Sequence, residues 1–272
     1  MASSKVQCRT SAMLGLIVLV SLADVAPVKA AESDPLYQST VIVTGYDMRS
    51  RPGGFARALR DVLVKLSGDP RLEKDPRVAE LGKHADSMVT SFDYVDLMAG
   101  IKVHDDQGTY DRSYNLTVRF DPARIDQTLA GLGQHPWRGT RPVVVPVIAM
   151  HGPKGAYLVR AEDPATADQR QSFAIIARDY SLNARIPTEA ELAAWGASAE
   201  GAPAAPPASR DDEAIVAGTL VFEDGVGWNG TWAMRSRGTD YTWKVVGVNY
   251  DEAFRDAVRG VLRIASGHDS PE

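Results

Sequence analysis

A stretch rich in proline and glycine, residues 136–142, divides the sequence into two halves that carry the same order of patterns. Each half begins with a strand pattern, continues with helical patterns and further strands, and ends with a helix pattern. A stretch of this composition between two complete sets is typical of a link between folded units. We therefore expect an α+β protein of two small domains, residues 31–139 and 140–272. Each is expected to have a short, mostly antiparallel sheet with helices packed on one face.

The patterns of the first half predict a strand, two helices, a hairpin and a third helix. The first helix has apolar residues at spacings of three and four. It is expected to end at Gly68, because glycine readily adopts the left-handed conformation of a helix C-cap. Asp75 and Asp121, each followed by proline, have the features of helix N-caps. The expected elements are a strand at 36–45, a helix through 55–66, a helix through 78–89, strands at 92–104 and 110–121 with a turn at 105–109, and a helix from 122 to 132.

The second half begins with an almost wholly apolar strand, residues 143–150, which indicates a strand covered on both faces. Helices are predicted at 165–180 and from Pro187 to Trp195, followed by an Ala/Pro-rich loop at 197–210 that we expect to be mobile. Three strands at 214–222, 228–235 and 241–248 come next. The chain closes with a helix that Asp251 caps and whose apolar stripe runs from residue 254 to 265.

The first 30 residues have the three parts of a secretory signal peptide. Lys5 and Arg9 form a positive segment, residues 13–23 form an apolar run, and residues 28–30 offer small side chains before a cleavage point. The apolar run is shorter than the roughly 20 residues that span a bilayer as a helix. We expect cleavage after Ala30, a periplasmic mature protein and no stable membrane insertion afterwards. Retention of the segment as an inner-membrane anchor is the alternative.

Cysteine usage and charge exclude several functions. The only cysteine, Cys8, precedes the apolar run, so the mature chain would hold no disulfide, thiolate metal site or cysteine nucleophile. Removing Lys5, Arg9, Lys29 and Asp24 takes +2 from a net charge of −5 and leaves −7. Nucleic acid is therefore not an expected partner, because phosphate contacts need positive charge and no basic, aromatic-rich cluster occurs.

Residues that could bind a metal ion show no recognisable spacing. The five histidines are scattered and none falls in HExxH or HxH spacing: His84, His104, His135, His151 and His268. The acidic residues around Gly108 lack the ligand series and distal glutamate of a calcium loop. We predict no metal site and no cofactor.

The polar residues that could suggest catalysis have structural explanations. Ser67 lacks the G-x-S-x-G elbow of a nucleophilic serine, whereas Gly68 and Asp69 fit a helix cap followed by a turn. Asp121 fits a helix N-cap better than a catalytic carboxylate. Residues 152–155 lack the length and hydroxyl residue of a phosphate-binding loop. We predict no catalytic residue from these motifs.

Three tryptophans are the most distinctive group in the sequence. Trp228, Trp232 and Trp243 lie on adjacent predicted strands, and the first two share a strand face because they are four residues apart. One interpretation is that this face packs under the C-terminal helix. The other is an exposed aromatic platform for a glycan or protein partner. We favour packing, and these three tryptophans are the candidate partner-binding residues under the other interpretation.

Four segments occur in an order that resembles a known family: residues 63–69 (LVKLSGD), 118–122 (VRFDP), 137–142 (WRGTRP) and 228–232 (WNGTW). They are similar to the proteobacterial secreted family catalogued as domain of unknown function 2066, although Arg138 displaces the first glycine of the third motif. The resemblance covers most of the chain from Leu36 onward. It implies a secreted protein without an assigned activity or catalytic residue. The second half is also loosely similar, at fold level, to the N-terminal domain of TolB-type adaptor proteins.

We therefore expect a non-enzymatic periplasmic protein that binds another envelope protein as an adaptor. The alternatives are a secreted enzyme, whose site would be assembled from residues distant in sequence, and a periplasmic protein tethered to the inner membrane. A cleft with convergent carboxylates or histidines would favour the enzyme. An apolar groove or a free sheet edge would favour the adaptor.

Overall fold

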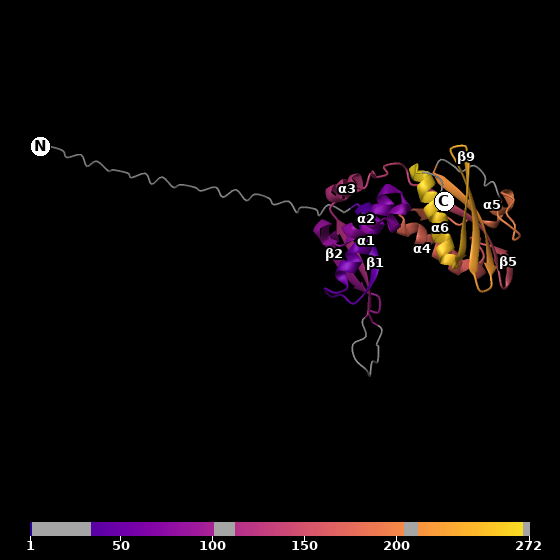
Figure 1. The fold of residues 1–272 in the computed structure, drawn as a ribbon, viewed down its shortest axis with the longest axis horizontal. Coiled ribbons are helices and arrows are strands. Elements are labelled where there is room, and N and C mark those ends of the chain that lie inside the picture. The colour runs from indigo at the N-terminus through magenta and orange to yellow at the C-terminus, as the bar shows by residue number, and fades with distance from the viewer. Residues whose placement is uncertain (2–33, 101–111, 204–211, 269–272) are drawn as a thin grey trace, which may run out of the picture. The chain divides into compact units, whose positions relative to one another are not determined.

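Two β-sheets, one from each half of the chain, organise the fold (Figure 1). The computed structural model describes residues 34–100, 112–203 and 212–268, together with Met1. The predicted signal peptide and the predicted turn at 105–109 lie outside the described residues. The combination of helices with two sheets confirms the predicted α+β class.

The first sheet has three antiparallel strands in the order β1-β3-β2, so β1 and β2 are its edges. This sheet and its helices form what we call the first lobe. Its elements are η1 (Pro35–Tyr37), β1 (Gln38–Thr44), α1 (Arg51–Ser67), η2 (Pro70–Lys74), α2 (Pro76–Gly82), η3 (Ala85–Met88), β2 (Val89–Asp96), β3 (Ser113–Phe120) and α3 (Pro122–Gly131).

Helix α1 covers one face of this sheet, as its apolar spacing predicts. The side chains of the predicted stripe are buried: Phe55, Leu59, Val62, Leu63 and Leu66. Gly54 allows close approach to the sheet, since a Cβ atom there would lie 2.5 Å from Cδ2 of Leu116. Gly68 ends the helix with φ of 75°, the left-handed cap expected from the sequence.

The predicted second helix is wrong in length. Asp75 caps it as expected by accepting a hydrogen bond from the Arg77 N–H, but α2 ends at Gly82. A separate 3-10 turn, η3, follows, and Val89 already belongs to β2. The buried residues of this segment belong in turn to a short helix, a 3-10 turn and a strand. They therefore do not lie on one continuous helical face.

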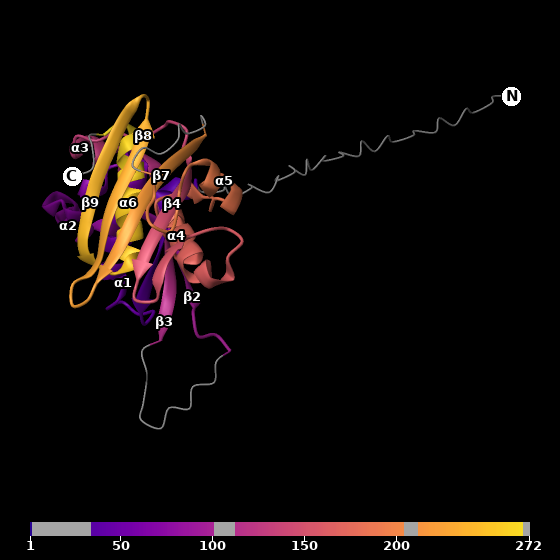
Figure 2. The ribbon, with the colours of Figure 1, turned by 90° about the vertical axis from the view of Figure 1, so that its right-hand side faces the viewer.

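The second sheet and its helices form the second lobe, in which five strands follow the order β5-β4-β7-β8-β9 and β6 pairs with β4. Figure 2 shows β9, β8, β7 and β4 side by side, with α6 behind them. Its elements are β4 (Val143–Gly152), β5 (Gly155–Leu158), η4 (Pro164–Thr166), α4 (Ala167–Asp179), β6 (Asn183–Ala184), α5 (Glu189–Ala194), β7 (Glu213–Glu223), β8 (Gly227–Ser236), β9 (Thr239–Val248) and α6 (Tyr250–Ser266).

The surroundings of β4 differ from the expected sheet with helices on one face. β4 runs parallel to β6 and β7, because the chain crosses over through α4 before it returns to the sheet. Ile148 belongs to the core that includes Phe173 of α4 and Phe254 of α6, whereas Val147 packs with Leu192 of α5. Helices therefore cover both faces at β4, which confirms the strand buried on both faces.

Helix α6 has the predicted apolar stripe but a different cap. The side chain of Asn249, rather than Asp251, accepts the Glu252 N–H at 2.8 Å. Asp251 lies in the first turn, where a negative charge favours the helix dipole. The stripe is buried as expected: Phe254, Ala257, Val258, Val261 and Leu262.

The described residues from 34 onward belong to one compact unit. Buried side chains of both lobes form one continuous hydrophobic cluster. The boundary predicted between residues 139 and 140 falls between the two sheets, and independent folding of the two parts stays a prediction. Within the described residues, no helix has both the length and the apolar character needed to cross a membrane.

The described part of the Ala/Pro-rich loop, residues 197–203, contacts the second sheet. The Ala202 N–H donates to Oγ1 of Thr219 at 3.1 Å, and Ala197 and Ala202 pack against the cluster around Leu192. Residues 204–210 lie outside the described residues. The mobility predicted for this loop therefore stays a prediction.

Candidate functional site

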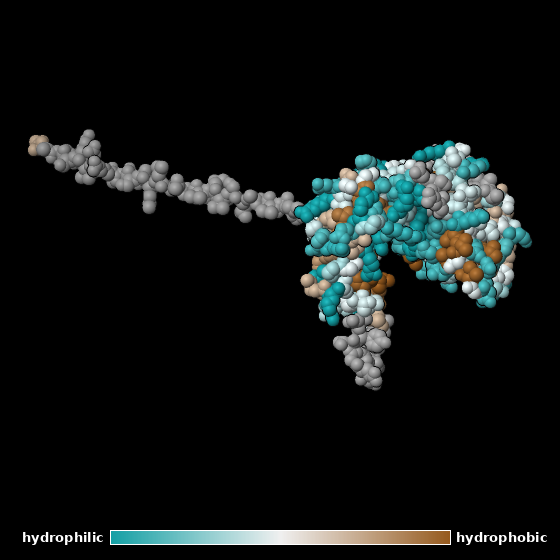
Figure 3. All heavy atoms as spheres, in the orientation of Figure 1, coloured by the Kyte–Doolittle hydropathy of each residue, from teal (hydrophilic) through white to brown (hydrophobic). Residues whose placement is uncertain are grey.

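A cleft of about 840 Å3 lies between the first and second lobes. Its walls come from β1, α1 and η2 on the first lobe, and from the end of α4, residues 180–183 and α6 on the second. Figure 3 shows the recess between the lobes bordered mainly by hydrophilic residues. The cleft is thus built from segments that are far apart in the sequence.

Strand β1 presents a free edge to this cleft. In an antiparallel pair, successive residues of a strand point their N–H and C=O groups to opposite edges. Just after β1, the Gly45 N–H donates to the carbonyl of Arg112 at 2.8 Å, so the odd-numbered residues face β3. The even-numbered residues Gln38, Thr40 and Ile42 therefore direct their backbone groups towards the cleft.

Two basic side chains of α1 hold carbonyl groups along this edge. Lys65 donates to the Gln38 carbonyl and to a second carbonyl in η1. Arg57 Nη2 donates to the Ile42 carbonyl at 2.6 Å. Within the part of the chain that the structure describes, the backbone N–H and C=O of Thr40, between these two positions, have no hydrogen-bond partner. The edge is therefore capped on both sides of one open position.

The cleft carries more basic than acidic side chains. Six are basic: Arg57, Arg60, Lys65, Arg178, Arg255 and Arg259. Four are acidic, and each lies near a guanidinium group. Glu73 and Glu252 lie 2.5 Å and 2.6 Å from Arg259. Asp61 lies 3.5 Å from Arg60, and Asp179 lies 3.8 Å from Arg255. Among the described residues, Arg57 of α1 and Arg178 of α4 form no ion pair within 4 Å, although the charge of Arg178 acts on the neighbouring Asp179. The local excess is two positive charges, on a chain whose net charge is −5.

Burial changes the ionisation of the α1 side of the cleft. Lys65 is 6% exposed, and burial lowers its pKa to about 8 although the charge of Asp61 opposes the shift. Burial raises the pKa of Asp61, which the neighbouring Arg60 holds down in part. The positive charge of the cleft therefore decreases as the pH rises through about 8.

Arg259 joins the two lobes at one side of the cleft. It donates to Glu73 of η2 through Nη2 at 2.5 Å, to Glu252 of its own helix at 2.6 Å and to the Tyr180 hydroxyl at 3.0 Å. The Tyr180 hydroxyl in turn donates to Glu73 at 2.7 Å. Burial, together with the charge of Glu73, raises the pKa of Tyr180, so this hydroxyl stays a neutral donor. The Glu73 carboxylate is therefore used in holding the two lobes together.

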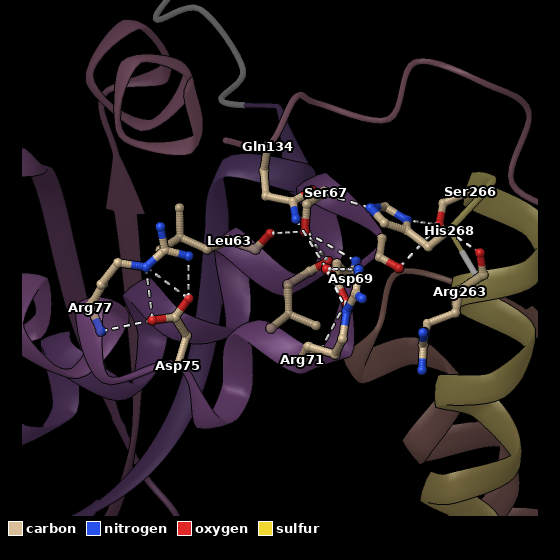
Figure 4. Close-up of polar contacts among 12 residues, drawn as sticks. Leu63, Ser67, Asp69, Arg71, Asp75, Arg77, Gln134, Arg263, Ser266 and His268 are labelled. Carbon is tan, nitrogen blue, oxygen red and sulfur yellow. Dashed lines mark hydrogen bonds and ion pairs between the residues drawn. The ribbon is translucent and has the colours of Figure 1, made fainter. Parts of the chain in front are cut away.

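A second polar network joins the lobes where α1 and α6 end (Figure 4). Asp69 accepts hydrogen bonds from the side chains of Arg71 at 2.8 Å and Gln134 at 3.0 Å. Burial opposes the negative charge of Asp69, but the bonds from Arg71 outweigh it and hold its pKa below the usual value. Oε1 of Gln134 lies 3.1 Å from His268 Nε2, and Ser266 Oγ lies 2.8 Å from His268 Nδ1.

This network has the residue types of a hydrolytic triad but a different arrangement. Gln134 lies between His268 and the Asp69 carboxylate and hydrogen-bonds to both, whereas in a triad the carboxylate bonds the imidazole directly. Ser266 Oγ lies 3.1 Å from the Gly68 carbonyl oxygen. A Cβ atom at Gly68 would be 2.4 Å from the Cβ of Ser266, so the two helix ends are in close contact. The network therefore ties α1 to α6.

The motif residues considered for catalysis have the structural roles that the sequence predicts. Ser67 is 1% exposed, and its hydroxyl donates to the Leu63 carbonyl at 2.8 Å. Asp69 accepts from the Arg71 N–H and opens η2. Asp121 accepts from two N–H groups at the start of α3.

The three candidate tryptophans lie outside the cleft. Trp232 and Trp243 are 0% and 4% exposed and are paired across β8 and β9. Trp228 is half-buried, and its ring packs edge-to-face on Phe222 with 5.4 Å between ring centres. The burial favours the packing interpretation for the first two. A partner-binding role stays a prediction, for which Trp228 is the most accessible of the three.

Among the described residues, no group of three metal-ligating side chains is placed to hold an ion. His104 lies outside those residues, and His268 belongs to the network between the lobes. No sequence pattern predicts the cleft itself. The one available signal was the spacing of Arg57, Asp61 and Lys65, which are four residues apart and so share one face of α1.

A family model described as a domain of unknown function (DUF8605) matches residues 30–138, which is less than half of the chain. That region holds the first lobe, including β1 and α1. The matched family is not the one that the sequence motifs resemble, and nothing in the match bears on that resemblance, which stays a prediction. No protein with a curated description matches the chain, and no solved structure matches it.

Proposed function

We propose that this chain is a non-enzymatic periplasmic protein that binds another protein of the cell envelope, as an adaptor, through the cleft between its lobes. The observation that carries the proposal is the free edge of β1 inside a cleft with excess positive charge. An open strand edge is a common docking element for a protein partner, because its unpaired backbone groups can hydrogen-bond to an added strand.

Glu73, one of the four carboxylates of the cleft, has a structural role rather than a role in acid–base catalysis. Glu73 is held by Arg259 and by the Tyr180 hydroxyl. A general acid or base needs a carboxyl group that can reach a substrate proton. We therefore assign Glu73 to the architecture of the site.

Site-specific photocrosslinking in cells tests the proposal. A photoreactive residue at Asn183, which is exposed and lines the cleft, should capture a discrete protein that mass spectrometry can identify. The same residue at Lys244, exposed on β9 outside the cleft, is the matched control. Replacing Arg57 and Arg178 with glutamine should abolish capture at Asn183. Equal capture at both positions, or none at Asn183, would contradict a binding role for the cleft.

The location has a separate test. The periplasmic fraction should contain a chain that begins at or near Ala31, as N-terminal sequencing would determine. If the chain instead retains Met1 or Cys8 and remains with the inner membrane, the released form is wrong and the tethered form is correct.

A further inference from the structure

We infer that the occupant of the cleft is an extended acidic segment of the partner protein, which adds to β1 as a fourth strand and places carboxylates against Arg57 and Arg178. The inference rests on the proposed function and assigns the chemistry of the partner at that site.

The backbone of the segment is recognised at the open position of the edge. Thr40 offers one N–H and one C=O group towards the cleft, and the N–H of Ile42 faces the same way. A strand laid beside β1 would supply complementary groups to all three. Five residues of β1, 38–42, line the cleft, and a strand of that length spans about 17 Å. The occupant is therefore a short extended segment.

The caps on the edge select for acidic side chains. Arg57 donates a hydrogen bond to the Ile42 carbonyl. A strand with neutral side chains would have to displace this guanidinium group from the carbonyl without offering it another charged acceptor. A carboxylate on the incoming segment offers Arg57 a charge-assisted bond, roughly twice as strong as a bond between neutral groups. Arg178, exposed on the opposite wall, offers a second guanidinium that forms no ion pair within 4 Å among the described residues.

A second copy of this chain does not fit the same edge. Pairing β1 with β1 of another molecule would bring Arg57 and Lys65 of each copy near their counterparts. Like charges brought together at such a junction oppose association, and charged side chains beside a strand edge protect it against self-pairing. Charge complementarity therefore indicates an acidic segment from a different protein.

Fluorescence anisotropy with defined peptides tests this inference on the purified protein. The probe is a labelled eight-residue peptide of alternating glutamate and valine. One analogue replaces glutamate with glutamine, which removes the charge and keeps the shape. A second is N-methylated at alternate residues, which removes the N–H groups that would pair with the edge. Arg57→Gln and Arg178→Gln are the cleft variants, with Lys244→Gln as the matched loss of one charge elsewhere, and circular dichroism checks that each variant is folded.

We expect the acidic peptide to bind and each analogue to bind about tenfold more weakly or worse. Each cleft variant should lose roughly five- to tenfold in affinity for the acidic peptide, while Lys244→Gln keeps the affinity of the unmodified protein. Equal binding of the glutamine peptide would overturn the charge selection, and equal binding of the N-methylated peptide would overturn the strand addition. If no peptide binds while the Asn183 crosslinker still captures a partner, this inference fails and the proposed function stands. If no peptide binds and the crosslinker at Asn183 captures no partner, both this inference and the proposed function are wrong.

Discussion

The indole ring of Trp232 lies directly against Gly218, its cross-strand partner on β7. A Cβ atom at Gly218 would be 2.0 Å from Cζ3 of that ring. Trp243 has the same relationship with Gly260 of α6, where a Cβ atom would lie 2.2 Å from Cζ2. The two buried indoles therefore occupy space that glycine leaves in a strand and in a helix.

Gly218→Ala should destabilise the protein by about 1–3 kcal/mol, because the added methyl group cannot be accommodated without moving the ring of Trp232. Urea denaturation measures the effect. Gly53→Ala is the matched control, since nothing lies within 4 Å of a Cβ atom at Gly53. The account is wrong if Gly218→Ala is as well tolerated as the control.

Trp232→Ala should lower the denaturation midpoint sharply, since truncating a buried tryptophan costs about 3–5 kcal/mol. Trp228→Ala should cost less, because Trp228 is only half-buried. The same denaturation experiment compares the two. If Trp232→Ala kept full stability but lost a binding partner, the tryptophans would be functional residues rather than core.

Local features of the fold could be predicted from the sequence, whereas long-range ones could not. The cap at Gly68 depends on residues that are neighbours in the chain, and the sequence predicts it correctly. The parallel pairing of β4 with β7 depends on a crossover through α4, which the strand patterns do not specify. The cap of α6 was misassigned by two residues because Asn249 and Asp251 both suit an N-cap.

The cleft was out of reach of sequence analysis for the same reason. Arg57 and Arg178 come from helices of different lobes, and their proximity depends on how the lobes pack. The link from Asp69 to His268 likewise runs through Gln134 and joins three separate segments. No local spacing signals such contacts.

Asp256 should give the protein a measurable pH dependence. Burial raises the pKa of this carboxyl to about 6, although the Trp243 side chain opposes the shift. An unfolded aspartate titrates near 3.9, so the folded state favours the protonated form. The stability that this group contributes is fully present below about pH 4 and is lost as the pH rises through about 6.

Asp256→Asn should therefore stabilise the protein at pH 8 by roughly 1–2 kcal/mol, after allowance for solvent screening, and have little effect at pH 4. Thermal denaturation across this pH range checks the prediction. Asp240→Asn is the control: hydrogen bonding to Arg235 lowers the pKa of Asp240, so this variant should show no such gain at pH 8. A stabilisation by Asp256→Asn that is independent of pH would contradict the assignment.

Glu73 and Arg259 should be energetically coupled, because their contact joins the two lobes. In a double-mutant cycle with Glu73→Gln and Arg259→Gln, we expect a coupling free energy of about 1–3 kcal/mol in urea denaturation. The exposed pair of Glu80 and Lys83 on the surface of the first lobe is the control and should show no coupling beyond error. Simple additivity at Glu73 and Arg259 would mean that this contact does not stabilise the packing of the lobes.

Hydrogen exchange of individual amides of β1, followed by NMR, tests the open strand edge most directly. In the free protein the N–H groups of Thr40 and Ile42 should exchange much faster than those of Val41 and Val43, which face β3. Addition of the glutamate–valine peptide should slow exchange at Thr40 and Ile42 and leave Val41 and Val43 unchanged. Slow exchange at Thr40 and Ile42 in the free protein, or fast exchange there with the peptide bound, would contradict a free edge that accepts a strand.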